Sequence, residues 1–191
     1  MQFFSLIFHA IYVIFYEKEA FSLSVWKKRC TFVGNMKTGL ILVGKTTERH
    51  FQTGIDDYCQ RLVHYMPFDV IVVPELKNSR SLSEDQQRAK EGEAILKVVQ
   101  PGDMLVLLDE HGKEMRSVEF ATWIEKRRQS SKRLLFCIGG PYGFSPAVYE
   151  RADEKISLSK MTFSHQMVRM VFVEQLYRAC TIINGEKYHH E

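Results

Sequence analysis

This 191-residue sequence has few cysteines, a small net charge and no long apolar run. The four cysteines, Cys30, Cys59, Cys137 and Cys180, are far apart and form no C-x-x-C pair. We therefore predict buried, reduced thiols in a cytoplasmic protein rather than catalytic nucleophiles. The 26 Lys and Arg against 23 Asp and Glu give a formal net charge of only +3. Any contact with nucleic acid must therefore come from a local basic patch.

The apolar stretch near the amino terminus is short. It runs from Phe3 to Tyr16, is broken by Ser5 and His9, and has fewer than the roughly 20 residues that a membrane helix needs. No basic residue precedes it and no small-residue cleavage site is evident, which argues against a secretory signal. We expect no membrane span. The alternative interpretation is an interfacial helix with residues 27–29 as its basic flank.

From Met36 onward, apolar runs of strand length alternate with stretches of helical period, which is typical of a single α/β domain with a mostly parallel sheet. We predict five or six strands with helices on both faces of the sheet. The expected strands are Thr38–Gly44, Phe68–Pro74, Asp103–Asp109, Arg133–Ile138 and Lys155–Ser159. The expected helices are Thr47–His64, Ser83–Val99 with a capping box at Ser83 and Gln86, Ser117–Gln129, a short one after Ser145, and Ser164–Ile183.

One motif matches a nucleotide-binding pattern but lacks the structural context for it. Residues 39–46 read GLILVGKT, which satisfies the P-loop expression G-x-x-x-x-G-K-[ST]. A P-loop needs its four variable residues to form a loop whose N–H groups surround phosphate. Here these residues are Leu-Ile-Leu-Val, which favour the strand itself. We therefore reject the P-loop interpretation.

Three loops that follow predicted strands are candidates for a ligand site, because ligands of open α/β sheets bind beyond the carboxyl ends of the strands. These loops are 107–113 (LLDEHGK), 139–145 (GGPYGFS) and 159–164 (SKMTFS). Three glycines within five residues of the second loop permit close approach of backbone to a ligand. A tight turn is the alternative explanation. The spacing G-G-x-x-G differs from the dinucleotide fingerprint G-x-G-x-x-G, which disfavours a dehydrogenase.

The last predicted helix and the tail carry further candidates. His165, Arg169, Phe172 and Leu176 fall on one helical face, while Arg178 lies nearly opposite Arg169. The alternative interpretation is that one of these two arginines is a solvated charge on the helix surface. The helix ends at an Asn-Gly pair, and the His-His-Glu terminus reads as disordered on its own. Metal binding is not expected, because no third and fourth ligand converge in the sequence.

Together, these loops, the last helix and the tail resemble the SPOUT class of knotted methyltransferases. The similarity is strongest to the small family that methylates N3 of a pseudouridine in 23S ribosomal RNA. It runs from Met36, where MKTGLILVG matches the opening strand of those proteins, to Glu191. Residues 1–35 would then be an extension outside the core domain of residues 36–191. The resemblance implies a SPOUT-type fold with a carboxy-terminal trefoil knot, a homodimer, and S-adenosylmethionine as the methyl donor.

The resemblance also implies roles for individual residues. Those expected to bind the cofactor are Leu108, Gly139, Gly140, Leu158, Ser159, Lys160, Met161, Thr162 and Phe163. Those expected to contact the substrate RNA are Tyr142, Arg178 and Tyr188, with the tail folding back toward the substrate. The nitrogen N3 must lose a proton before it attacks, so a base and an anion-stabilising cation are needed. We predict Arg169 as the cation and leave His165, His189 and His190 open as candidate bases.

The implied substrate is the large subunit or the whole 70S ribosome rather than free RNA, because a protein this small has little surface for reading sequence. The alternative function is a catalytically silent SPOUT-like RNA-binding or ribosome-assembly factor. Binding of S-adenosylmethionine in a calorimeter would favour the enzyme over the silent factor.

Overall fold

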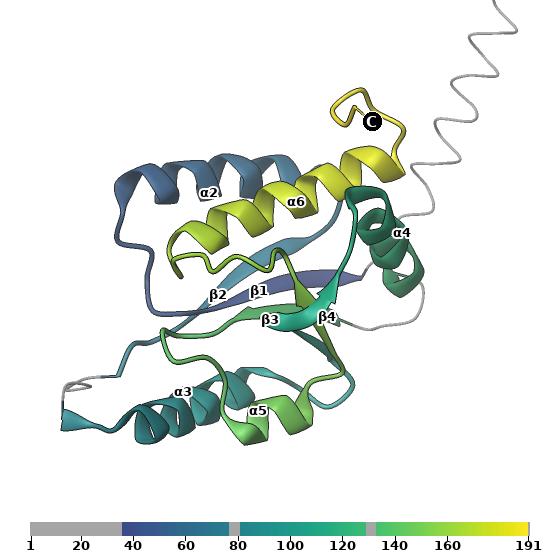
Figure 1. The fold of residues 1–191 in the computed structure, drawn as a ribbon. Helices are drawn as coiled ribbons and strands as arrows, with labels where there is room; N and C mark the ends of the chain where they lie inside the picture. The colour runs from purple at the N-terminus through teal and green to yellow at the C-terminus, as the bar shows by residue number, and fades with distance from the viewer. Residues whose placement is uncertain (1–35, 77–80, 129–132, 191) are drawn as a thin grey trace, which may run out of the picture. The chain divides into compact units, whose positions relative to one another are not determined.

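A computed structural model describes residues 36–76, 81–128 and 133–190 of the chain, and Figure 1 shows its arrangement. Five strands form one sheet in the order β2-β1-β4-β3-β5, and all four pairings between them are parallel. The strands are β1 (Lys37–Val43), β2 (Phe68–Val73), β3 (Met104–Glu114), β4 (Arg133–Ile138) and β5 (Glu154–Ser157). The helices are α2 (Arg49–Leu62), α3 (Glu84–Val98), α4 (Ser117–Arg128), α5 (Pro146–Arg151) and α6 (Met167–Ile183).

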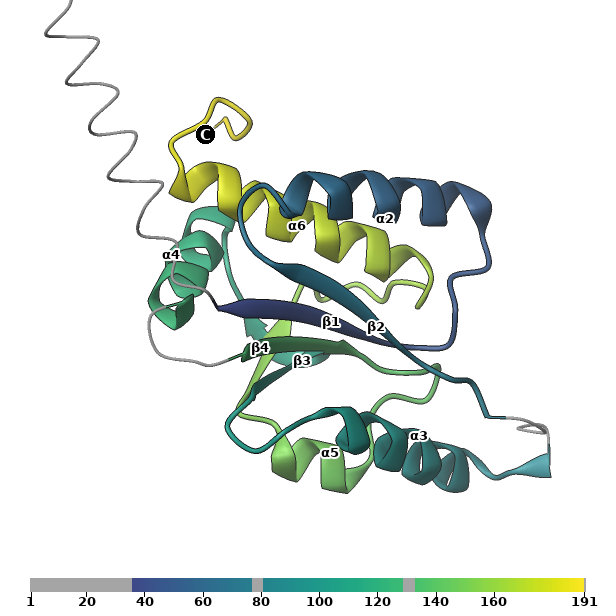
Figure 2. The ribbon, with the colours of Figure 1, turned by 180° about the vertical axis from the view of Figure 1, so that it is seen from behind.

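Helices cover both faces of the sheet (Figures 1 and 2). On one face, Ile55 of α2, Phe120 of α4 and Phe172 of α6 belong to one buried apolar cluster. On the other face, Ile95 of α3 and Val148 of α5 belong to a second cluster. The central strands β1 and β4 are buried on both sides, as their unbroken Leu, Ile and Val runs predict. The predicted α/β fold with a parallel five-stranded sheet is confirmed, while the trefoil knot stays a prediction.

The rejection of the P-loop is confirmed by the position of Leu40–Val43. These four residues lie inside β1 and are buried. Gly44 follows with φ of +74°, a left-handed conformation that ends the strand. The backbone of this motif therefore pairs with neighbouring strands and is not free to surround phosphate.

Three predicted boundaries need correction. Helix α2 begins at Arg49 rather than Thr47, because Thr46 and Thr47 are bonded to the segment around α6 and do not cap α2. Helix α6 begins at Met167 rather than Ser164. Strand β3 continues to Glu114 instead of ending at Asp109. The capping box of α3 formed by Ser83 and Gln86 is confirmed.

Several expectations fall on residues outside the described part of the chain. These are the amino-terminal extension of residues 1–35 with its apolar run and Cys30, and the terminal Glu191. Among the described residues, no helix is long and apolar enough to cross a membrane.

Candidate active site

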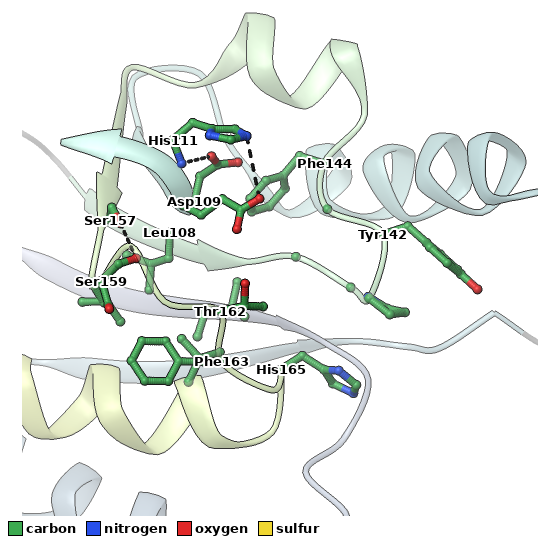
Figure 3. Close-up of a pocket in the computed structure, with 18 of the residues that line it drawn as sticks. Leu108, Asp109, His111, Tyr142, Phe144, Ser157, Ser159, Thr162, Phe163 and His165 are labelled. Carbon is green, nitrogen blue, oxygen red and sulfur yellow. Dashed lines mark hydrogen bonds and ion pairs between the residues drawn. The ribbon is translucent and has the colours of Figure 1, made fainter. Parts of the chain in front are cut away.

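A cavity of about 520 Å³ lies at the carboxyl ends of β4, β3 and β5 (Figure 3). These strands are adjacent and parallel, so the loops that follow them meet at one edge of the sheet. The volume lies in the range of small-molecule and cofactor sites. The lining residues come from all three loops, from α3 and α5, and from the start of α6: Arg88, Leu108, Asp109, Glu110, His111, Ile138, Gly139, Gly140, Pro141, Tyr142, Gly143, Phe144, Tyr149, Ser157, Leu158, Ser159, Met161, Thr162, Phe163, His165 and Val168.

The first wall of the cavity is a bulge in β3. Leu108 and Lys113 both pair with Ile156 of β5, so residues 109–112 are inserted between them and leave the ladder. Gly112 makes this possible, because a Cβ atom there would lie 2.5 Å from the carbonyl carbon of Ile156. The bulge places Asp109, Glu110 and His111 at the cavity before pairing with β5 resumes at Lys113.

Asp109 is a polar side chain of this bulge with both carboxylate oxygens hydrogen-bonded. Its Oδ1 accepts from the His111 backbone N–H at 2.8 Å, and its Oδ2 accepts from the Tyr149 hydroxyl at 2.5 Å. The sequence identified the loop but neither Asp109 nor Tyr149 as lining residues. Arg88 was also missed, because nothing in the pattern of α3 indicates that this residue reaches the ends of β3 and β4.

The second wall is the glycine-rich turn after β4. Gly140 and Gly143 form a bridge, with the Gly143 N–H donating to the Gly140 carbonyl at 3.1 Å. A Cβ atom at Gly140 would lie 2.3 Å from Oε2 of Glu91, a carboxylate that α3 presents against the turn. The glycine cluster therefore forms a tight turn and also lines the cavity, so the two explanations offered by the sequence are compatible.

Glu91 is the buried ionisable group behind this turn. Only 5% of it is exposed; Gln87 donates to its Oε1 at 2.8 Å, and its Oε2 has no hydrogen-bond partner among the described residues. Burial raises the pKa of Glu91 above its ordinary value of 4.5, and the charge of Glu75 acts in the same direction. The side chain favours the protonated form more than a solvated glutamate does.

The third wall is the segment from Ser157 to His165. Ser157 Oγ donates to the Ser159 carbonyl at 2.9 Å, and Ser159 Oγ accepts from the Met161 N–H at 2.9 Å, which fixes the turn. Lys160 does not line the cavity. Its side chain is 86% exposed, and its ammonium lies 3.8 Å from a Glu114 oxygen. Of the residues predicted to bind the cofactor, Lys160 alone lies outside the cavity lining.

His165 lies at the edge of the cavity, in the segment before α6 (Figure 3). The expectation that it shares a helical face with Arg169 is wrong, because α6 begins only at Met167. The sequence placed the helix start too early, since Ser164 has cap chemistry. Ser164 Oγ does accept from the Met167 N–H at 3.2 Å, one turn before the regular helix.

Arg169 is buried in the core and does not line the cavity. Its Nη2 donates to the Val43 carbonyl at 2.7 Å, and its Nη1 donates to the Gly44 carbonyl at 3.0 Å and to Thr46 Oγ1 at 3.1 Å. Burial lowers its pKa, while the charge of Glu75 opposes that effect. The guanidinium therefore fastens the end of β1 to α6. The anion-stabilising role of Arg169 stays a prediction, and these bonds, which hold the cation away from the cavity of its own chain, do not favour it.

Arg178 and Tyr188 lie together near the other end of α6. The Arg178 guanidinium carbon lies 4.8 Å from the centre of the Tyr188 ring. Ten residues separate Arg178 from Val168 at the cavity, which corresponds to about 15 Å along a helix. The tail therefore folds onto α6 without reaching the cavity of its own chain. His189 follows Tyr188, is half-buried, and has a buried Nδ1 that makes no hydrogen bond within the described residues.

The described cysteines are poor nucleophiles. Cys137 and Cys180 are buried, Cys59 is half-buried, and all three are free thiols. Burial raises the pKa of Cys180 to about 12 and that of Cys59 to about 11. The predicted burial is confirmed for Cys137 and Cys180, whereas Cys59 is only half-buried. No group of three or more His, Cys, Asp or Glu that could hold a metal ion occurs within residues 36–76, 81–128 and 133–190.

Fold and cavity together define an α/β protein with a cavity of the size of cofactor sites at the carboxyl ends of adjacent parallel strands. Comparison with known proteins identifies the family. A family model described as predicted SPOUT methyltransferase matches residues 36–189. The chain therefore belongs to the SPOUT methyltransferase family.

Curated relatives are similar over their whole length. Proteins named ribosomal RNA large subunit methyltransferase H from Bacteroides fragilis, Phocaeicola vulgatus and Parabacteroides distasonis are 64%, 62% and 60% identical to this chain. Each alignment spans 157 residues, which is 82% of this chain and 100% of the relative.

Proposed function

We propose that this chain transfers a methyl group from S-adenosylmethionine to N3 of a pseudouridine in 23S ribosomal RNA, within the large subunit or the assembled ribosome. The observation that carries the proposal is the meeting of three loops at one cavity in a SPOUT-family chain. The names of the full-length relatives support ribosomal RNA as the substrate. A ribosomal substrate favours a cytoplasmic location.

The cavity has the shape and chemistry to hold S-adenosylmethionine. Leu108, Leu158 and Phe163 offer apolar surface for the adenine ring, and the turns at Gly139–Gly140 and Ser159–Met161 offer backbone donors and acceptors. Gly140 lines the cavity, and on its other side Glu91 leaves no room for a side chain. The sulfonium supplies an activated methyl group, and the chain's own residues must orient the acceptor and manage one proton.

The proton on N3 requires a base near the cavity. His165 lines the cavity of its own chain, and its imidazole is exposed to an incoming nucleotide. His189 and His190 belong to the tail and stay candidates, and the buried Nδ1 of His189 makes no hydrogen bond among the described residues. Loss of the N3 proton leaves a negative charge on the pseudouridine ring. Arg178 is the better candidate for stabilising this charge, because Arg169 already binds three protein oxygens.

We further propose that two copies of the chain build each active site. The cavity and the cluster of Arg178 and Tyr188 occupy opposite ends of α6, about 15 Å apart by helical rise. One chain therefore cannot bring its own Arg178 to its own cavity without unfolding α6. A second copy related by twofold symmetry can place its tail at the first copy's cavity. Tyr142, exposed at the cavity rim, is then positioned to stack on an RNA base.

The proposal is tested by methyl incorporation with labelled S-adenosylmethionine. The substrates are ribosomes from cells that lack this protein, isolated large subunits, and protein-free 23S RNA. We expect incorporation into the ribosomal particles at one pseudouridine, located by mass mapping of nucleotides, and little into free RNA. Absence of incorporation into any ribosomal substrate, in a preparation that binds the cofactor, would overturn the proposed function.

A further inference from the structure

Glu174 lies at the centre of the polar cluster that joins the tail to α6. Its Oε1 accepts from Arg178 Nη2 at 2.5 Å and from the Tyr188 hydroxyl at 3.0 Å. Its Oε2 accepts from Gln175 Nε2 at 2.7 Å. The Glu174 side chain is only 17% exposed. The Glu174 carboxylate therefore connects an arginine of the helix to a tyrosine of the tail. This tyrosine, Tyr188, lies fourteen positions after Glu174 in the sequence.

The Tyr188 ring is held from several sides as well. It packs edge-on against Tyr177 with ring centres 4.9 Å apart, and the Arg178 guanidinium lies over it. The Tyr58 hydroxyl of α2 is 3.3 Å from the Tyr188 hydroxyl. Since Tyr188 donates to Glu174, Tyr58 donates to Tyr188. Burial and these hydrogen bonds raise the pKa of Tyr188, which keeps the phenol protonated as the donor that Glu174 needs.

We propose that Glu174 is a positioning residue for methyl transfer, whose carboxylate holds Arg178 and Tyr188 in one fixed arrangement and thereby sets where His189 lies. This inference rests on the proposed function, in which Arg178 and the tail meet the substrate. An ionised acceptor between the two side chains restricts their rotamers before the substrate arrives. A misplaced arginine would slow the chemical step more than it weakens cofactor binding.

A simple helix-stabilising ion pair is the competing explanation, because Glu174 and Arg178 have i, i+4 spacing. Two observations favour the positioning role. The same oxygen that meets Arg178 also accepts from a tail residue, and the carboxylate is mostly buried. A pair that only supports the helix needs neither feature.

The test compares Glu174→Gln with the full-length wild-type protein on ribosomes that lack the methyl group. We expect kcat to fall by about tenfold or more. The KM for S-adenosylmethionine should change by less than about twofold, because Glu174 does not line the cavity and lies about 9 Å along α6 from Val168, which does. Glu174→Asp, which keeps the charge, should recover part of kcat. Asp57→Asn is the matched control, since it removes the carboxylate of an i, i+4 pair with Arg61 that is half-exposed.

A second readout does not depend on activity. Nuclear magnetic resonance of tyrosines labelled at Cζ, assigned with Tyr188→Phe, follows the titration of Tyr188. Loss of the Glu174 carboxylate should lower the pKa of Tyr188 toward its ordinary value, and the Asp57→Asn control should leave it in place. This measurement works even if the wild type transfers no methyl group.

The outcomes separate the two proposals. A wild type that is inactive on every ribosomal substrate overturns the proposed function, and with it the positioning role. An active wild type with kcat and the Tyr188 titration both unchanged in Glu174→Gln overturns the positioning role alone. If thermal stability, cofactor affinity and kcat all fall together in Glu174→Gln, then Glu174 only supports the fold. That result would also overturn the positioning role.

Discussion

At the scale of single residues, Arg169 and Arg178 show how two arginines of one helix acquire different tasks. Arg169 faces the core and donates to the carbonyls of Val43 and Gly44. Arg178 is half-buried and is oriented by Glu174 and Tyr188. A guanidinium that satisfies the open carbonyls at a strand end contributes to folding, while one held by a carboxylate and an aromatic ring remains available to a ligand.

Replacement of Arg169 by alanine should destabilise the protein. The change leaves buried carbonyl oxygens without donors, and we expect the free energy of unfolding to fall by about 2–4 kcal/mol. Urea denaturation followed by circular dichroism measures the loss. Lys45→Ala, an exposed side chain of the same turn, is the control and should be nearly neutral. Unchanged stability together with abolished methyl transfer would instead restore Arg169 as the anion-stabilising cation.

Replacement of Glu91 by glutamine should change how stability depends on pH. Because the folded state raises the pKa of Glu91 above 4.5, folding takes up a proton there. The wild type therefore loses stability as the pH rises from 4.5 through the raised pKa. Glu91→Gln lacks this loss, so it should gain in melting temperature relative to the wild type across that window. A difference between the two proteins that is constant with pH would contradict the expectation.

The sequence predicted which loops line the cavity better than it predicted the contacts of individual side chains. Gly139, Gly140 and the segment after β5 follow apolar strands, a signal that sequence carries directly. The hydrogen bonds of Arg169 to the end of β1 could not be predicted, because helical period gives the face of a side chain and not the atoms that meet it. Asp109 and Tyr149 were missed since their hydrogen bond joins residues forty positions apart.

At the scale of elements, the bulge in β3 shapes the cavity most. The strand could have ended at Asp109, as the sequence predicted, yet pairing with Ile156 resumes at Lys113. Register between two strands depends on both partners, so a single-strand pattern could not reveal it. The other strands were predicted within one or two residues, since buried parallel strands give unbroken apolar runs.

Replacement of Gly112 by alanine tests the bulge. The new methyl group would meet the Ile156 backbone, which cannot move without shifting β5. We expect a loss of about 1–3 kcal/mol of folding free energy and weaker binding of S-adenosylmethionine. Thermal unfolding and titration calorimetry measure the two effects. Lys113→Ala is the matched control, and an affinity equal to the wild type in Gly112→Ala would show that the cavity does not depend on the bulge.

At the scale of the whole molecule, the proposed methyl transfer requires two copies of the chain to share each site. The cavity collects loops from three strands at one end of α6, while Arg178 and Tyr188 lie together further along the helix and are joined by Glu174 at its middle. No rotation of side chains closes a gap of about 15 Å along a rigid helix. From the sequence we predicted only that Arg169 and Arg178 lie on opposite faces of the helix; neither the separation along α6 nor the packing of the tail on α6 could be read from helical spacing.

Mixing two inactive variants tests this claim most directly. Thr162→Trp fills the cavity and leaves the tail intact, whereas Tyr188→Ala removes the tail's anchor and leaves the cavity intact. After subunit exchange, half of the dimers are mixed and each contains one intact composite site, so we expect about a quarter of wild-type methyl transfer to ribosomes. A mixture that stays as inactive as its components, although subunit exchange is verified, would contradict the shared site.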